Sequence, residues 1–138
     1  MAQNATEQGL VLENLTAGYQ KKIIVDDITL TIPPEKMTVL VGANGCGKST
    51  LLSTIARLLQ PMGGAVRLDG HVIHDQPTKA VSRRLGILPQ SPLLPEGLTV
   101  FELVSRGRFP WQNFMRQWTD ADELAVEEAL RLTGTQDY

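Results

Sequence analysis

The sequence predicts an α/β fold, and three observations support this prediction. A short apolar segment, residues 37–41, leads directly into a glycine-rich loop, residues 42–50. Apolar residues at helical spacing follow the loop, and two segments that are typical of strands joined by a polar turn precede it. Strands and helices that alternate in this order are typical of a sheet covered by helices.

The predicted strands begin with two segments joined by a polar turn, residues 15–19 (LTAGY) and 23–32 (IIVDDITLTI). Residues 37–41 (MTVLV) are apolar throughout, which suits a strand buried on both faces of a sheet. Residues 64–70 (GAVRLDG) read as a strand and a turn. Residues 85–90 (LGILPQ) read as a short strand that ends at a proline and a glutamine.

Three helices are predicted. The first follows the glycine-rich loop and is closed by Pro61, and the second is a short helix after Pro77. The third begins after the N-cap Thr119 and ends at Gly134, with acidic residues in its first turn. The apolar residues of the first helix are Leu51, Leu52, Ile55, Ala56 and Leu59.

The loop itself, GANGCGKST, has the spacing of a phosphate-binding loop. The first turn of a helix has N–H groups without intrahelical partners and about half a positive charge, so an anion is stabilised there. Glycines let the backbone approach phosphate closely. We expect Lys48 to contact the β- and γ-phosphates and Ser49 to bind Mg²⁺. The expected nucleotide-binding residues of the loop are Gly42, Asn44, Gly45, Cys46, Gly47, Lys48, Ser49 and Thr50.

A phosphate-binding loop alone leaves kinases, GTPases, transport ATPases and chromosome-organising ATPases open. From about residue 10 onward, the sequence resembles the ATP-binding subunits of ABC transporters. The resemblance lies in Tyr19 before the second strand, in the glycine-rich loop, and in Gln90 after a short strand. The resemblance implies that Tyr19 stacks on adenine, and that Gln90 contacts Mg²⁺ or the attacking water. On that basis the expected catalytic residues are Lys48 and Gln90, and the expected metal ligands are Ser49 and Gln90.

The resemblance also implies an incomplete P-loop NTPase fold of the ABC ATPase type. Its antiparallel β-subdomain and P-loop core would span about residues 9–90, and the Q-loop and the start of the helical subdomain about residues 90–138. The implied cofactors are ATP and Mg²⁺. The implied partners are transmembrane permease subunits and a second ATP-binding subunit in a homodimer, at the cytoplasmic face of the inner membrane.

A finer resemblance lies in residues 104–110 (VSRGRFP) and in Asp122, Val126, Ala129 and Leu130. This sequence pattern resembles that of importer ATPases for iron–siderophore, haem or cobalamin uptake, and it fits the iron–siderophore branch best. Aromatic and basic residues concentrate in the same region, which favours a contact surface for a helix of the membrane partner, although the rings could instead pack the helical subdomain. The aromatic residues are Phe109, Trp111, Phe114 and Trp118, with Met115 among them, and the basic residues are Arg106, Arg108 and Arg116.

Residues 132–136 (LTGTQ) imitate the ABC signature, but they end a predicted helix, where carbonyl groups would repel phosphate. We therefore expect the 138 residues to be the N-terminal part of a larger subunit, without signature, Walker B strand or switch histidine, and inactive alone as an ATPase. The remaining alternatives are the ATPase head of a chromosome or DNA-repair protein and a non-catalytic nucleotide-binding fragment.

Composition excludes several other classes of function. The chain is 42% hydrophobic with a net charge of −2, and it has no apolar run near the roughly eighteen residues of a membrane span. We expect no nucleic-acid surface, and contact with the membrane only through a partner. The single cysteine, Cys46, permits no internal disulfide. His71 and His74 alone make a weak zinc site.

Overall fold

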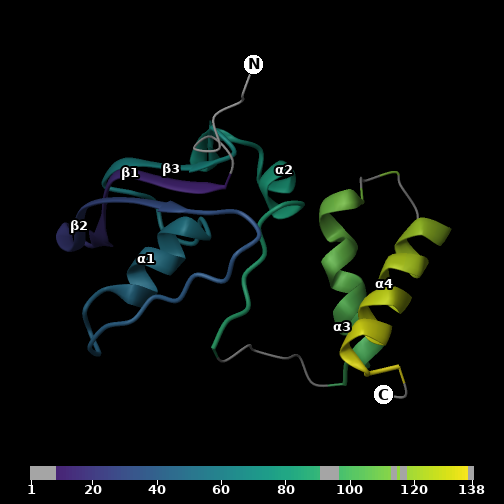
Figure 1. The fold of residues 1–138 in the computed structure, drawn as a ribbon. Helices are drawn as coiled ribbons and strands as arrows, with labels where there is room; N and C mark the ends of the chain where they lie inside the picture. Colours follow the sequence, from purple (N-terminus) through teal and green to yellow (C-terminus); the bar gives the residue numbers. More distant parts are fainter. Residues whose placement is uncertain (1–8, 91–96, 113–114, 116–117, 137–138) are drawn as a thin grey trace. The chain divides into compact units, whose positions relative to one another are not determined.

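The computed structural model describes residues 9–90, 97–112, 115 and 118–136. The chain divides into two compact units, residues 1–77 and residues 78–138. The first unit holds the β-sheet and the helix that follows the glycine-rich loop, and the second unit is helical (Figure 1).

The sheet of the first unit is antiparallel, with the strand order β2-β1-β3-β4. The predicted hairpin is confirmed, and so is the strand before the Asp69-Gly70 turn, because each of these strands finds its partner within the same unit. The four strands are β1 (Leu10–Tyr19), β2 (Lys22–Ile32), β3 (Gly63–Leu68) and β4 (His71–Val72).

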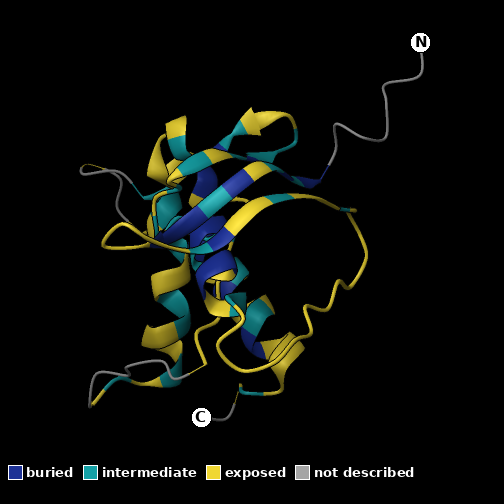
Figure 2. Ribbon diagram, turned by 90° about the vertical axis from the view of Figure 1, so that its left-hand side faces the viewer, coloured by how far each residue is buried: buried dark blue, intermediate teal, exposed yellow. Residues whose placement is uncertain are grey.

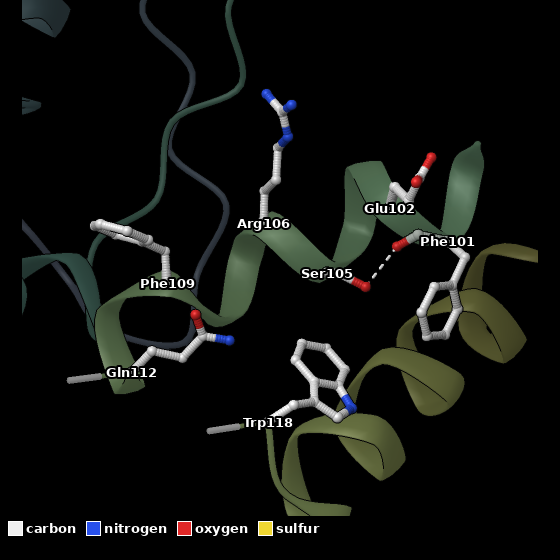
Figure 3. Close-up of a pocket in the computed structure, with 7 residues that line it drawn as sticks. All are labelled: Phe101, Glu102, Ser105, Arg106, Phe109, Gln112 and Trp118. Atoms are coloured by element: carbon white, nitrogen blue, oxygen red, sulfur yellow. Dashed lines mark hydrogen bonds between the residues drawn. The ribbon is translucent and has the colours of Figure 1, made fainter. Parts of the chain in front are cut away.

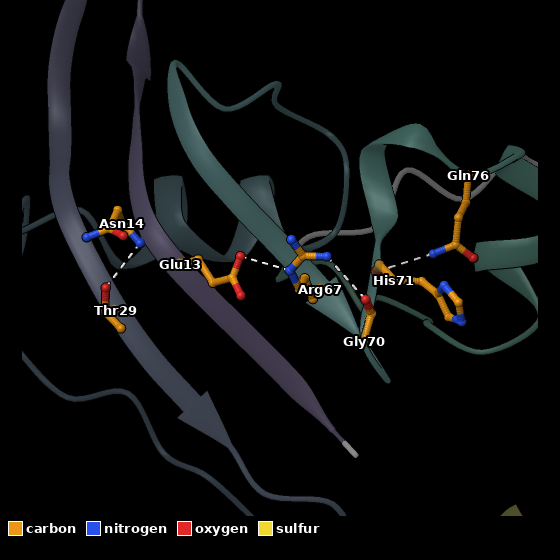
Figure 4. Close-up of polar contacts among 7 residues, drawn as sticks. All are labelled: Glu13, Asn14, Thr29, Arg67, Gly70, His71 and Gln76. Atoms are coloured by element: carbon orange, nitrogen blue, oxygen red, sulfur yellow. Dashed lines mark hydrogen bonds and ion pairs between the residues drawn. The ribbon is translucent and has the colours of Figure 1, made fainter. Parts of the chain in front are cut away.

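Side chains fix the register between β1 and its neighbours. The pairing of β1 with β2 shifts between Leu12 and Leu15, where the backbone of Asn14 takes a φ of 45°. The Asn14 N–H donates to Thr29 Oγ1 at 3.0 Å, across to β2 (Figure 4). On the other side of β1, Arg67 Nε donates to Glu13 Oε2 at 2.8 Å. The first contact joins the two strands of the hairpin, and the second joins β1 to β3, which is distant in the sequence.

Helix α1 (Lys48–Ile55) packs against β1 and β2 and completes the core of the first unit. The predicted continuation of this helix to Leu59 was wrong. Arg57 adopts a left-handed φ of 62°, and the N–H groups of Leu58 and Leu59 both donate to Ser53 O, which ends the helix. The buried residues of the first unit are shown in dark blue in Figure 2 and include Leu12, Leu15, Ala17, Val25, Leu51, Ile55, Val66 and Ile73.

The prediction of a buried strand over residues 37–41 was also wrong. These residues form no strand, and Met37 and Val41 are 93% and 81% exposed. Their apolar, β-branched composition favours extended chain, but a strand also needs a hydrogen-bonded neighbour. Among the described residues, the sheet offers no strand that pairs with this segment.

The second unit contains α2 (Thr78–Ser82), α3 (Val100–Ser105), the 3-10 helix η2 (Arg106–Trp111) and α4 (Asp120–Thr133). The helix predicted between Thr119 and Gly134 is confirmed, because Thr119 and Asp122 form a capping box and Gly134 closes the helix with a φ of 64°. Residues 132–136 therefore lie at the end of a helix, as predicted. Helices α3 and α4 pack side by side (Figure 1).

Residues 85–90 were predicted to form a strand, and this was wrong. The segment has no regular structure, and Leu88 is 90% exposed. Like residues 37–41, it has the composition of a buried strand without a neighbouring strand in the part of the chain that the structure describes.

Candidate nucleotide-binding site

The glycine-rich loop leads into α1 through two glycines with left-handed backbone. Gly45 has a φ of 81°, and Gly47, the N-cap of α1, has a φ of 98°. A Cβ atom at Gly47 would lie 3.0 Å from Val25 Cγ2 and 3.3 Å from Ile24 O, whereas one at Gly45 would meet nothing within 4 Å. Strand β2 therefore supports the end of the loop at Gly47, and Gly45 lies in open space.

Lys48 extends back across the loop. Its Nζ donates to the carbonyl oxygens of Gly42 and Ala43, each at 2.7 Å, and lies 3.6 Å from Cys46 Sγ. A Cβ atom at Gly42 would lie only 2.7 Å from Cys46 Sγ, so the loop is closely packed at this point. The positive charge is thus held within the curve of the loop, where an anion would bind.

The start of α1 supplies further donors. Its first backbone hydrogen bond runs from Leu51 N to Gly47 O at 2.9 Å, so Lys48, Ser49 and Thr50 form the turn whose N–H groups have no acceptor within a helix. Ser49 is exposed, and its hydroxyl is accessible to a ligand, whereas the residue after it, Thr50, is buried. The loop thus combines exposed glycine backbone, three N–H donors and an ammonium group. These groups suit the binding of the phosphates of a nucleotide.

Two predicted site residues lie outside the loop. Tyr19 is the last residue of β1 and is 51% exposed, and a tight turn through Gln20 and Lys21 follows it. Its ring is therefore available for stacking. Gln90 belongs to the second unit and is exposed. The role of each residue toward a nucleotide stays a prediction.

The second unit has a groove of about 930 Å³ with aromatic rings in its walls (Figure 3). The Phe101 and Trp118 rings are 6.4 Å apart between centroids, and each residue is 40% exposed. Phe109, also at the groove, is 66% exposed. The residues that line the groove are Phe101, Glu102, Ser105, Arg106, Phe109, Gln112 and Trp118.

The aromatic cluster predicted from the sequence is thus divided. Phe109 and Trp118 line the groove, whereas the Trp111 ring lies 4.4 Å from the Arg108 guanidinium carbon. Phe114 and Arg116 lie outside the described residues. The sequence did not indicate Phe101, because this residue stands apart from the dense aromatic segment. Its spacing of four residues from Ser105 places both residues on one face of a helix, and this was the available signal.

Asp122 is fully buried and joins two parts of the second unit. Its Oδ1 accepts from Arg108 Nε at 2.9 Å, and its Oδ2 accepts from Thr119 Oγ1 at 2.7 Å and from Thr119 N at 3.2 Å. Hydrogen bonds from Thr119 and Arg108 hold the pKa of the Asp122 carboxyl below its usual range. The side chain is therefore a carboxylate at neutral pH.

The surroundings of the two histidines differ, and His71 is exposed. Within the described ranges, no group of three potential ligands gathers around a common point. His74 is half-buried with Nε2 3.4 Å from Leu59 O, and burial lowers its pKa. Nor does any helix in the described part of the chain have the length and apolarity that a bilayer crossing requires.

The chain is similar to known proteins in both sequence and fold. The sequence profile described as ABC transporter matches residues 25–138. The probable siderophore transport system ATP-binding protein YusV of Bacillus subtilis (strain 168) is 53% identical over 125 residues, which are 91% of this chain and 46% of that protein. The achromobactin transport ATP-binding protein CbrD of Dickeya dadantii (strain 3937) is 55% identical over 121 residues, which are 88% of this chain and 45% of that protein.

Among solved structures, one described as the ATP-binding subunit of an ABC transporter superposes with a TM-score of 0.75 and 27% identity. The match covers 94% of this chain and 52% of that one. The chain thus spans about half the length of the curated relatives it matches. These relatives give no support to the alternative of a chromosome-organising head.

Proposed function

Because the chain belongs to the ABC transporter family, we propose that it is the nucleotide-binding half of an importer ATPase subunit that serves iron–siderophore uptake. The observation that carries the nucleotide-binding part is the Lys48 ammonium, held 2.7 Å from two carbonyl oxygens inside the glycine-rich loop. The choice of cargo rests on the siderophore and achromobactin names of the two relatives that share more than half of the aligned residues.

Each residue of the site has a proposed role. The N–H groups at the start of α1 and the backbone of Gly45 and Gly47 would surround the phosphates, and Lys48 would exchange its carbonyl partners for the β- and γ-phosphate oxygens. The Ser49 hydroxyl would hold Mg²⁺, whose bound charge neutralises the phosphates. Tyr19 would stack on adenine, an interaction of about 0.5–1.5 kcal/mol beyond burial.

We further propose that the groove of the second unit receives a short helix of a transmembrane permease subunit. Phe101, Phe109 and Trp118 offer an apolar surface, and Glu102 and Arg106 add one charge of each sign to it. Exposed aromatic rings around a pocket are typical of an interface core. The proposed assembly is a homodimer of ATP-binding subunits on two permease subunits, at the cytoplasmic face of the membrane.

For the 138 residues alone, we infer nucleotide binding without hydrolysis. Every strand that the structure describes precedes Gln90, so among the described residues no later strand presents a carboxylate that could hold Mg²⁺ and activate water. A Mg²⁺-dependent ATPase rate that Lys48→Ala abolishes would contradict this inference.

Calorimetric titration of the chain with ATP and ADP, with and without Mg²⁺, tests the nucleotide site. We expect Lys48→Ala and Tyr19→Ala to weaken binding and the exposed control Lys36→Ala to leave it unchanged. Lys48→Ala removes a charge beside the phosphates, so its effect should be larger for ATP than for ADP. Equal affinities for the original chain and Lys48→Ala, in folded samples, would refute the proposed site.

A further inference from the structure

The groove of the second unit has two walls that are separate in the sequence. One wall comes from α3 and η2, with Phe101, Phe109 and the adjoining Gln112. The other comes from Trp118, directly before the N-cap of α4 (Figure 3). A groove of this kind keeps its shape only if something joins the walls, because the lining side chains are largely exposed.

Besides the packing of α3 against α4, Asp122 makes a direct polar connection between the two walls. Its Oδ1 accepts from Arg108, which precedes Phe109 in η2, and its Oδ2 accepts from Thr119, which follows Trp118. Each carboxylate oxygen therefore holds one wall. The connection is shielded from water, since the Asp122 side chain is 0% exposed and that of Arg108 is 20% exposed, and hydrogen bonds between charged groups are stronger than neutral ones.

Capping of α4 does not account for both bonds. In the capping box of α3, Thr99 donates through N and Oγ1 to a single oxygen of Glu102, at 2.8 and 2.9 Å. Thr119 uses a single oxygen of Asp122 in the same way. One oxygen is thus sufficient for the cap, and the bond from Oδ1 to Arg108 is an addition that reaches another element.

Neighbouring contacts hold the η2 wall on its outer side. Arg83 Nε donates to Pro110 O at 3.0 Å, and Lys79 Nζ donates to Gln112 O at 2.6 Å, so α2 fixes the end of η2. The Arg108 guanidinium lies over the Trp111 ring while it bonds Asp122. Loss of the bond to Asp122 would leave η2 attached to α2 and α3 but without its direct hydrogen bond to α4.

We propose that Asp122 is a positioning residue for the groove, and that its ion pair with Arg108 sets the distance between the two walls and hence the affinity of the groove for an apolar ligand. The inference rests on the proposed docking function for its biological meaning. Asp122 itself would not contact the partner, because it is fully buried.

The test uses the fluorescent dye 8-anilinonaphthalene-1-sulfonate as a probe of the groove. The dye is excited by energy transfer from tryptophan. The two tryptophans of the sequence, Trp111 and Trp118, both lie in the second unit, so the signal reports dye bound there. Phe109→Ala serves to locate the dye, since it removes a groove ring and should weaken binding. The control Glu128→Gln removes an exposed ion pair to Arg131 on the same helix.

We expect Asp122→Asn to weaken dye binding roughly five- to tenfold, because the amide can still accept from Thr119 but cannot accept from Arg108. Glu128→Gln should bind like the original chain. The double variant Asp122→Asn with Arg108→Gln should recover part of the affinity, since the two amides can hydrogen-bond to each other. Helix content from circular dichroism should stay unchanged throughout.

Equal dye affinity for Asp122→Asn and Glu128→Gln would reduce Asp122 to a helix cap and overturn the inference. If Asp122→Asn loses helix content, Arg108→Gln decides the question, because it leaves the Thr119 cap intact, and unchanged dye affinity in that variant overturns the inference. Failure of the proposed docking function would give a different result from failure of this inference, because the original chain would then bind the dye but no permease subunit.

Discussion

Replacement of Gly47 by alanine should destabilise the first unit more than the same change at Gly45. Both glycines have left-handed backbone, which costs an alanine about 1–2 kcal/mol. At Gly47 the new Cβ would also lie 3.0 Å from Val25 Cγ2 and 3.3 Å from Ile24 O, and overpacking of this kind costs about 1–3 kcal/mol. We therefore expect a total near 2–5 kcal/mol for Gly47→Ala, against about 1–2 kcal/mol for Gly45→Ala.

Hydrogen–deuterium exchange resolved by peptide measures this difference in the first unit alone. A further 1–3 kcal/mol in Gly47→Ala corresponds to exchange of the α1 amides roughly five to 150 times faster than in Gly45→Ala. The second unit should exchange identically in both variants and serves as an internal control. Equal exchange of α1 in the two variants would show that β2 does not support the loop, and the steric argument would be wrong.

Three further predictions concern stability. Leu12→Ala should cost about 2–5 kcal/mol in urea unfolding, because Leu12 of β1 is fully buried; a cost below about 1 kcal/mol would contradict the assigned core. Burial lowers the pKa of His74, so the first unit should lose stability as pH falls below about 6.5, the unfolded value. His74→Gln should remove that pH slope and the exposed control His71→Gln should not. The lowered pKa of Asp122 means that its contribution to α4 is complete above about pH 4 and is lost as pH falls through the folded pKa. An acid melting curve of α4 that is the same in Asp122→Asn would refute this assignment.

Local sequence signals predicted the elements whose partners are close in the chain. The β1–β2 hairpin and the capped helix α4 formed as expected, because turn residues and capping residues act within a few positions. Residues 37–41 and 85–90 have the composition of buried strands and yet are largely exposed. Strand formation depends on a neighbour, and composition alone does not supply one. The early end of α1 follows from the left-handed Arg57, which hydrophobic spacing does not reveal.

The candidate site was predictable in part for the same reason. The spacing of the glycines and the lysine predicted the loop, because the loop's backbone geometry depends on residues that are close in the sequence. The contacts of Lys48 with Gly42 and Ala43 were not predictable, since they depend on how a flexible side chain folds back. Arg108 and Asp122 are fourteen positions apart and belong to different helices. Their hydrogen bond depends on how these helices pack, so it was not predictable from the sequence.

The two carbonyl bonds of Lys48 have a consequence for selectivity among anions. A ligand that reaches this ammonium exchanges existing hydrogen bonds and does not simply add new ones. An anion with little charge gains almost nothing over two carbonyl dipoles, whereas a doubly charged terminal phosphate gains a full ionic interaction. The loop would then select for charge density, and a singly charged anion such as chloride or nitrate should compete poorly with a triphosphate.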